Sequence, residues 1–443
     1  MAQDTLELTC ERMGYGPDAI AHRDDGKTVF VLGGAPGDVV RCEVTGTGSS
    51  FDRARVVEVV SAGDARRAAA CTYAGVCGGC PWAHLTRAAQ LDAKRGAVID
   101  ALARIGKMGR EAAEGLVGAC EAPSDEWGYR NKVELAFVRE GGRVSLGMHG
   151  AGEGSPIKVK QCMLLEKRFA GSVKSVSGAL SYLAGSRAEI DLERVGIRAS
   201  VRTKELEVAL WDSPGPFPRA QASKIIGDAT RATSVVRVLE KGPAKARRVS
   251  SVERLSGAGC WSELVGDHKM LLSAPSFFQV NTRGAERLIE LVMEGLEVRE
   301  DDVTMDLYCG AGTFTLPLAD RCDWVEAVEA YAPAVRDLRR NLERAGIDNV
   351  SAQGGDAGRE FPDIDADVIV VDPPRAGLAA DVVEQLSASG ARAIAYVSCD
   401  PATLARDLER FAEAGSYRPT RVTPVDLFPQ TFHVESVAIL KSV

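Results

Sequence analysis

The sequence lacks the features of an exported or membrane-embedded protein. Its first residues do not combine a basic stretch with a following apolar run, and no apolar run approaches the roughly 20 residues that cross a bilayer. The 11 cysteines are an odd number without an export signal, which argues against a disulfide framework. We therefore expect a cytoplasmic protein with no membrane partner, whose clustered cysteines bind a metal or take part in catalysis.

Positive charge is scarce as well. The net charge is −8, so the chain as a whole offers no electrostatic attraction for a nucleic acid. Contact with RNA or DNA would need local basic patches, although such clusters are also typical of an ordinary solvated surface. The two candidate patches are Arg53, Arg55, Arg66 and Arg67, and Lys241, Lys245, Arg247 and Arg248.

The length and the N-terminal pattern indicate a small β-barrel followed by larger domains. With 443 residues, 45% of them hydrophobic, the chain is long enough for about three domains. Short apolar segments separated by glycine turns are typical of barrels that include oligonucleotide-binding folds. The expected strands are Leu6 to Cys10, Lys27 to Leu32, Asp38 to Val44 and Arg53 to Val60. Arg53 and Arg55 would share one face of the last strand.

The middle of the chain is less regular. Residues 63–83 are rich in glycine and cysteine and predict irregular structure, whereas 84–106 have helical character. A hairpin is expected from Lys132 to Phe137 and from Val144 to Met148, with its turn at Gly141-Gly142. Residues 171–260 contain no motif that we can interpret.

From about residue 302 strands and helices alternate, which predicts a parallel sheet wound with helices on both faces. The expected strands are Val303 to Tyr308, Trp324 to Glu329, Asp367 to Val371 and Ala393 to Val397, and the expected helices are Pro333 to Ala345 and Asp381 to Leu386. Two adjacent strands, Arg421 to Asp426 and His433 to Leu440, should add an antiparallel edge.

A glycine-rich turn follows the first of these strands. Gly310 and Gly312 let the backbone approach a ligand, and Glu329 ends the next strand about 20 residues later, as expected for a carboxylate that accepts from ribose hydroxyls. The third glycine of the dinucleotide pattern is missing, which favours S-adenosylmethionine over a pyrophosphate cofactor. Asp372, at the end of a later strand and before Pro373-Pro374-Arg375, should face the same ligand or its substrate.

Cys399 lies where an apolar strand ends and a helix begins. Asp400 is a good N-cap and Pro401 a good first helical residue. A thiol beside the positive end of a helix is favoured as thiolate, the nucleophilic form, so this position predicts covalent chemistry. A small buried apolar residue at a strand end is the alternative interpretation.

Three further cysteines, Cys71, Cys77 and Cys80, lie within one glycine-rich loop. A closed zinc site or an iron–sulfur cube needs four ligands, so a fourth must come from elsewhere. We expect Cys162, which follows Lys160-Gln161, rather than Cys120 or Cys260. Ligation by sulfur alone fits either kind of metal centre.

Together these residues resemble the RNA uracil-C5 methyltransferases, the family that makes 5-methyluridine in ribosomal and transfer RNA. The resemblance covers the whole chain and is strongest from Ser276 to Leu440. It implies three domains: an RNA-binding TRAM barrel at 1–62, a central α+β domain with a [4Fe-4S] site at 63–270, and a doubly wound, Rossmann-like methyltransferase domain at 271–443. Tyr129-Arg130-Asn131-Lys132 also matches a recurring segment of the central domain.

The resemblance implies a role for each residue of the site. Contacts to S-adenosylmethionine are implied for Gln279, Tyr308, Thr313, Glu329 and Asp356, and Asp372 would lie between the cofactor and the target base. Thr313 stands where asparagine is common in the family. Cys399 would be the nucleophile, and Glu435, in Phe428-Pro429-Gln430-Thr431-Phe432-His433-Val434-Glu435, would be the general base. His433 is expected to be structural, and Phe277 either stacks on a flipped nucleotide or belongs to the core.

The expected activity is methylation of uridine C5 in RNA by a monomer without an obligate protein partner. We expect 23S ribosomal RNA as the substrate, with the T-loop of transfer RNA as the alternative. RNA cytosine-C5 methylation uses the same cysteine attack but is disfavoured by the Glu435 motif. An alternative from another class is an iron–sulfur RNA-binding protein with an inactive methyltransferase-like domain. The cluster has no step to perform in methyl transfer, so we expect a structural role for it.

Overall fold

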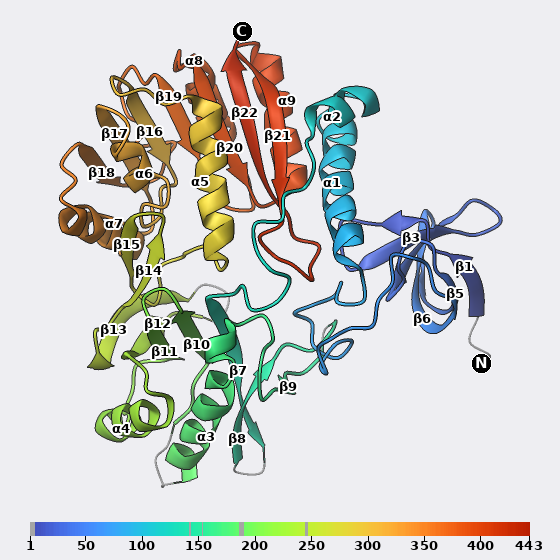
Figure 1. The fold of residues 1–443 in the computed structure, drawn as a ribbon, viewed down its shortest axis with the longest axis horizontal. Coiled ribbons are helices and arrows are strands. Elements are labelled where there is room, and N and C mark those ends of the chain that lie inside the picture. The colour runs from blue at the N-terminus through green and yellow to red at the C-terminus, as the bar shows by residue number, and fades with distance from the viewer. Residues whose placement is uncertain (1–4, 141–142, 153, 186–189, 244–246) are drawn as a thin grey trace.

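The computed structural model describes residues 5–140, 143–152, 154–185, 190–243 and 247–443. At the N-terminus six strands form one sheet in the order β1-β5-β6-β4-β3-β2, and β1 also approaches β3 across the curled sheet (Figure 1). The strands are β1 Thr5–Thr9, β2 Arg12–Met13, β3 Asp18–His22, β4 Thr28–Leu32, β5 Val39–Thr47 and β6 Phe51–Ser61. The four strands expected from the sequence are present, and β2 and β3 were missed.

The cysteine-rich segment after this sheet has turns and no long strand or helix, as expected. It leads into α1 (Arg87–Arg104) and α2 (Arg110–Leu116). Thr86 caps α1 by accepting a hydrogen bond from Ala89 N. Although α1 precedes the central region in sequence, it packs against the C-terminal sheet, where its apolar residues share one core with helix α9 (Pro401–Ala414) (Figure 1).

The central region is a seven-stranded sheet in the order β13-β12-β11-β10-β7-β8-β9. The expected hairpin is present as β7 and β8, and its expected turn, Gly141-Gly142, lies outside the described residues. Residues 171–260, which gave no interpretable motif, supply four of the strands and two helices that pack on the sheet. The elements are β7 Lys132–Glu140, β8 Arg143–Met148, β9 Ile157–Lys158, the 3-10 turn Lys167–Phe169, α3 Ser172–Gly185, β10 Arg194–Ser200, β11 Glu205–Asp212, α4 Arg219–Thr230, β12 Ser234–Lys241 and β13 Arg248–Gly257.

A two-stranded hairpin, β14 (Trp261–Val265) and β15 (His268–Leu272), joins this region to a second seven-stranded sheet in the order β18-β17-β16-β19-β20-β22-β21. Helices cover both faces of that sheet (Figure 1). The elements are α5 Thr282–Leu296, β16 Val303–Leu307, α6 Thr315–Ala319, β17 Trp324–Glu329, α7 Ala332–Ala345, β18 Val350–Gly354, β19 Val368–Val371, α8 Ala380–Ala388, β20 Ala393–Ser398, β21 Tyr417–Val425 and β22 Glu435–Ser442.

This sheet has the expected doubly wound topology with an antiparallel edge. Strands β16 to β20 are parallel, and β22 runs antiparallel between β20 and β21. The chain winds outward from β16 to β18 and then returns to the other side of β16 through β19. The strand order therefore reverses between β16 and β19, and in such sheets ligands bind at the carboxyl ends of the strands beside that reversal.

The basic patches expected from the sequence are only partly present. Arg53 and Arg55 share an exposed face of β6, as predicted. Arg53 pairs with Asp18 and Arg55 with Glu43 at the surface, whereas Arg66 binds buried Asp38 and the Gly33 carbonyl and Arg67 binds Glu126 and Gln430, so all four arginines of the first candidate patch have acidic partners. In the second patch Arg247 pairs with Glu193, whereas Lys245 lies outside the described residues. No helix among the described residues is long and apolar enough to span a membrane.

Candidate active site

The residues singled out in the C-terminal sheet meet at one edge. Tyr308 follows β16, Glu329 ends β17, Asp372 follows β19 and Cys399 follows β20, and these are the carboxyl ends of parallel strands. Glu435 begins β22, which runs in the opposite direction, so its first residue lies at the same edge. The topology therefore brings the expected cofactor residues and the expected catalytic residues to one edge of the sheet.

The glycine turn is built around Glu329. One carboxylate oxygen of Glu329 accepts from Gly310 N at 2.9 Å, and the other accepts from Tyr331 N at 2.6 Å. Gly310 and Gly312 have φ of 58° and 101°, a conformation that side-chain-bearing residues rarely adopt. A Cβ at Gly312 would lie 2.4 Å from a methyl group of Leu316, so this glycine is also required for packing.

The backbone around Gln279 is held by Asn131, which belongs to the segment Tyr129-Arg130-Asn131-Lys132. Asn131 donates from its side chain to the Gln279 carbonyl at 3.0 Å and from its backbone to the Val280 carbonyl at 2.8 Å. The Gln279 side chain is buried, yet its Oε1 has no hydrogen-bond partner in the part of the chain that the structure describes. A buried acceptor without a partner is costly, and a bound ligand with a donor group would satisfy it.

Tyr308, Asp356 and Thr313 lie at the same end of the sheet. Tyr308 has a left-handed φ of 64°, and burial together with the charge of Asp356 raises the pKa of its phenol to about 12. The Asp356 side chain is exposed and accepts from Gly358 N at 3.2 Å. Thr313 is half-buried.

Asp306 belongs to this region, although the sequence argument gave it no role. It accepts from the Thr315 hydroxyl at 2.6 Å, its Oδ1 has no partner, and burial raises its pKa to about 7. An aspartate in an apolar strand just before a glycine turn is the signal that could have identified it.

The two adjacent phenylalanines before Gln279 have opposite environments. The Phe277 side chain is 68% exposed, whereas that of Phe278 is 4% exposed and packs against Trp261. Exposure removes the core interpretation for Phe277 and leaves its ring free to stack on a base.

Cys399 and Glu435 lie at the same end of two paired strands. The register of β20 and β22 ends with Ser398 paired to Ser436, and Cys399 and Glu435 are the residues next to that pair. The charge of Glu435 acts on the Cys399 thiol, so the two side chains are near each other. Asp400 caps α9 by accepting from Ala402 N at 2.9 Å and Thr403 N at 3.1 Å, and Pro401 is the first helical residue, as predicted.

The prediction that this position favours a thiolate is wrong for the site without ligands. Burial, followed by the charges of Glu435 and Asp372, raises the pKa of the Cys399 thiol to about 11. Arg375 acts in the opposite direction but does not outweigh them. The helix terminus was visible in the sequence, whereas the two carboxylates come from strands that the topology brings alongside. A further positive charge near the thiol would favour its ionised form.

Glu435 has the properties of a poised base. Its side chain is 3% exposed, its Oε2 has no hydrogen-bond partner among the described residues, and burial raises its pKa to about 7 although Arg375 lowers it. A carboxyl group with a pKa near the ambient pH is present in both forms and can accept and release a proton. Asp372 is more strongly affected, since burial and the charge of Glu435 raise its pKa well above the usual range.

His433 is not poised in this way. Burial and Arg375 lower its pKa to about 4, so its ring is neutral at pH 7 and can accept from the Arg375 guanidinium, 3.5 Å from its Nδ1. This agrees with the expected structural role.

The four cysteines expected to bind a metal also come together. Cys71, Cys77, Cys80 and Cys162 line one cavity of about 70 Å³. Cys120 lies instead near Asp426 and Lys94, and Cys260 near Arg340. Among the described residues no three His, Cys, Asp or Glu side chains converge closely enough to hold a single metal ion. The other residues that line the cavity are mainly apolar and include Tyr73, Trp127, Met148, Val159 and Leu164. Arg130 also lines it and carries a positive charge.

Comparison with known proteins identifies the family. The family model described as tRNA (uracil-5-)-methyltransferase matches residues 265–354 and 356–443. An uncharacterized RNA methyltransferase of Thermosynechococcus vestitus is 32% identical over 98% of both chains, and one of Streptomyces coelicolor is 35% identical over 99% of this chain and 93% of the relative. The chain therefore belongs to a family of RNA methyltransferases and is a transferase.

Among solved structures, the tRNA (uracil-54, C5)-methyltransferase of Pyrococcus abyssi, in complex with S-adenosyl-L-homocysteine, has the same fold. It is 24% identical, the TM-score is 0.75, and the match covers 98% of this chain and 99% of that one. The common fold includes the N-terminal sheet domain and the C-terminal methyltransferase sheet.

Proposed function

We propose that this chain methylates C5 of uridine in RNA through a transient bond between Cys399 and C6 of the base, with Glu435 as the general base. The observation that carries the proposal is the pairing of β20 with β22, which brings a half-buried thiol, just beyond the end of β20, near a buried carboxyl group with a pKa of about 7 at the start of β22. Nucleophile and base are the two groups that this reaction requires from the protein.

Each group has one step to perform. The Cys399 thiolate forms a bond to C6, and the electrons of the C5–C6 double bond move into an enolate, which makes C5 nucleophilic. C5 then receives the methyl group. Glu435 removes the remaining hydrogen of C5 as a proton, the double bond returns, and the C6–S bond breaks to release Cys399 as thiolate. No electron is gained or lost overall, so the reaction needs no redox partner.

S-adenosylmethionine is the proposed methyl donor, and its sulfonium supplies an electrophilic methyl group when bound. The residues that would hold it are Gln279, Tyr308, Gly310, Thr313, Glu329 and Asp356, and Asp372 would lie between it and the base. The unpartnered buried Oε1 of Gln279 and the glycine turn around Glu329 support this assignment. The positive charge of a bound donor would also favour the Cys399 thiolate.

A [4Fe-4S] cluster is the proposed occupant of the cysteine cavity, with Cys71, Cys77, Cys80 and Cys162 as ligands. A zinc ion needs all its sulfurs at about 2.3 Å from one atom, whereas a cube binds each sulfur to a different iron and so accepts a wider spacing. The support for this occupant is that all four cysteines line one mainly apolar cavity. Its role here would be structural, because it fixes the loop that precedes α1.

We propose RNA as the macromolecular substrate and 23S ribosomal RNA as the first candidate, because a TRAM-like barrel followed by a cysteine cluster resembles the ribosomal branch of the family. Transfer RNA is the alternative, since the matching family model and the Pyrococcus abyssi enzyme are both named for it. Exposed Phe277 beside the cofactor residues would stack on the flipped target base.

The test is covalent trapping with RNA that contains 5-fluorouridine. Fluorine at C5 cannot leave as a proton, so the intermediate should persist as a protein–RNA complex on a denaturing gel. The native chain should form this complex, and a Cys399→Ala variant should form none and should not methylate. Native-rate methylation by Cys399→Ala would refute the proposed mechanism. Mass spectrometry of the modified nucleoside separates uridine from cytosine methylation, and parallel assays with ribosomal and transfer RNA identify the substrate.

A further inference from the structure

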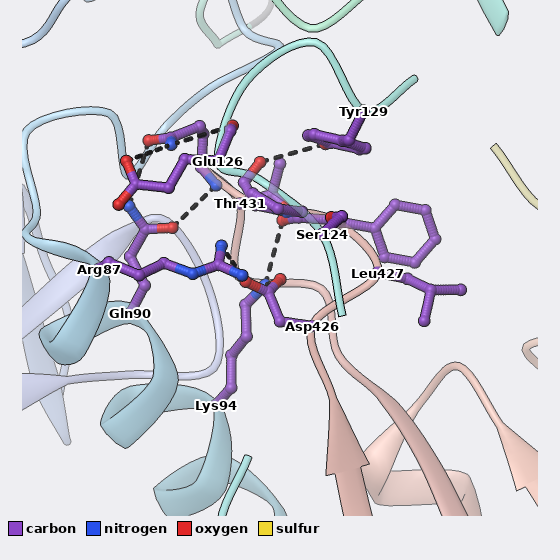
Figure 2. Close-up of polar contacts among 12 residues, drawn as sticks. Arg87, Gln90, Lys94, Ser124, Glu126, Tyr129, Asp426, Leu427 and Thr431 are labelled. Carbon is purple, nitrogen blue, oxygen red and sulfur yellow. Dashed lines mark hydrogen bonds and ion pairs between the residues drawn. The ribbon is translucent and has the colours of Figure 1, made fainter. Parts of the chain in front are cut away.

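The loop of residues 426–434, which links β21 to β22 and ends immediately before Glu435, is held by polar groups from distant parts of the chain. We call it the closing loop. Figure 2 shows α1 contributing Arg87, Gln90 and Lys94 on one side of it, with Glu126 and Tyr129 on another. The Tyr129 hydroxyl donates to the Pro429 carbonyl at 3.2 Å.

The central contact is a reciprocal pair of buried glutamines. Gln90 accepts from Gln430 N at 2.8 Å and donates from its Nε2 to Gln430 Oε1 at 3.1 Å. Both side chains are fully buried. The Gln90 amide also donates to the Trp82 and Leu85 carbonyls, at 3.2 and 3.1 Å. Gln90 thus ties the closing loop to α1 and to the turn that follows the cysteine loop.

Gln430 needs this support because its backbone is strained. Its φ is +72°, in the left-handed region that costs energy for a residue with a side chain. Every polar group of Gln430 nevertheless has a partner: besides Gln90, its carbonyl accepts from Trp82 N at 3.0 Å, its Oε1 accepts from Arg67 at 3.0 Å, and its Nε2 donates to the Glu126 carbonyl at 3.3 Å. A conformation held by so many contacts is the kind that persists at functional sites.

One turn further along α1, Lys94 secures the start of the same loop. Its buried ammonium pairs with buried Asp426 and donates to the Phe428 carbonyl at 3.0 Å, and Arg87 pairs with the same carboxylate (Figure 2). Residues four apart on a helix lie on one face, so Gln90 and Lys94 act on the loop together.

We propose that Gln90 and Gln430 are positioning residues for the base, and that they act on the proton-removal step. This inference rests on the proposed function. Glu435 lies only five residues after Gln430 in the chain. Proton transfer requires the base to lie within hydrogen-bond reach of C5, so the position of this loop affects the base directly. The bond between Cys399 and C6 would form just beyond the end of β20, and among the described residues the hydrogen bonds of the glutamine pair go to other segments. Loss of the pair should therefore slow the last step much more than the first.

The experiment measures the two steps separately in a Gln90→Met variant, which keeps the length of the side chain and removes its hydrogen bonds. With ordinary uridine RNA and S-adenosylmethionine we expect the rate of bond formation to Cys399 to stay within about twofold of the native rate. The rate of product release should fall by roughly 100-fold, because a displacement of the Glu435 carboxylate by about 1 Å can produce a loss of that size. The methylated Cys399–RNA complex should then accumulate on natural RNA, where the native chain shows little. A loss of stability alone would lower both rates and leave no such complex.

Two further variants keep the test decisive. Gln430→Gly retains the left-handed backbone without the side chain and should also accumulate the complex, and it replaces Gln90→Met if that variant folds poorly. Leu180→Ala, in the core of the central region, is the control for lost stability and should accumulate none. Equal slowing of both steps in the two glutamine variants would overturn the inference. Failure of the native chain to bond 5-fluorouridine RNA would instead refute the proposed function itself.

Discussion

Asp372 lies close enough to Glu435 for the charge of one carboxyl group to raise the pKa of the other. The shift takes the pKa of Asp372 well above its ordinary range, while that of Glu435 is about 7. For Asp372 burial is the largest cause of this rise and the charge of Glu435 adds to it, whereas for Glu435 burial raises the pKa and the charge of Arg375 lowers it. The pKa values of these two carboxyl groups at one strand end therefore depend on different charged neighbours.

The first prediction concerns pH. Only the carboxylate form of Glu435 can remove the C5 proton, and this form is lost as pH falls through about 7. Once the Cys399–C6 bond has formed, proton release from C5 should therefore slow about tenfold per pH unit below 7 and level off above it. Tritium release from RNA labelled at C5, followed after a pH jump from the already bonded complex to between about pH 5.5 and 8.5, checks this. A rate that stays constant down to about pH 5.5 would contradict it.

Arg375 should set the position of that pH profile. Its charge lowers the pKa of both Glu435 and Cys399. In an Arg375→Met variant both pKa values should rise, so the profile for proton release should move to higher pH and bond formation to Cys399 should slow at neutral pH. Arg375→Lys keeps the charge and should lie between the variant and the native chain. An unmoved profile in Arg375→Met would show that the cation does not act on the base.

The adjacent phenylalanines provide a matched pair. Phe277→Ala removes an exposed ring, so it should leave the melting temperature unchanged and weaken RNA binding about tenfold, as expected for loss of one stacked base. Phe278→Ala empties a buried position and should lower the free energy of unfolding by about 3–5 kcal/mol. Filter binding and thermal unfolding measure the two effects. Native RNA affinity in Phe277→Ala would exclude the stacking role.

Glu329→Gln should weaken cofactor binding. Both carboxylate oxygens of Glu329 accept hydrogen bonds from backbone N–H groups. In the glutamine variant the side-chain NH2 would face one of these N–H donors, and the negative charge that a ribose hydroxyl would donate to would be lost. We expect affinity for S-adenosylhomocysteine to fall about tenfold in calorimetry, equivalent to about 1.4 kcal/mol. Glu326→Gln is the control, since Glu326 lies on the same strand and binds the Trp324 indole instead. Equal losses in both variants would indicate a general defect of β17.

The C-terminal sheet could be predicted because its sequence follows simple rules. Its buried strands are short apolar runs, and glycine turns or helix caps follow them, as at Gly310 and Asp400. Strands β10 to β12 were missed because buried charges interrupt their apolar pattern. Arg198, Glu207 and Arg237 are almost fully buried there, and each is held by hydrogen bonds to distant residues that a local pattern does not reveal.

For the site, the sequence alone suggested which side chains act as nucleophile and base, but it did not predict their pKa values. Cys399 and Glu435 could be proposed from their motifs, and the pairing of β20 with β22 places them at the same end of the sheet. The raised pKa of the thiol could not be predicted, because it depends on burial and on Asp372, which a separate strand supplies. The reciprocal contact between Gln90 and Gln430 joins residues 340 positions apart, and no local pattern indicates such a pair.

The packing of α1 on the C-terminal sheet affects where this chain can be divided. A fragment that begins at residue 271 would contain the whole Rossmann-like sheet but would leave Asp426 without both of its cations and would expose the apolar face of α9 that α1 covers. Such a truncated catalytic piece should aggregate or misfold when expressed alone. Transplanting the methyltransferase unit into another protein would therefore require carrying residues 86–131 with it, as a second segment of the same folding unit.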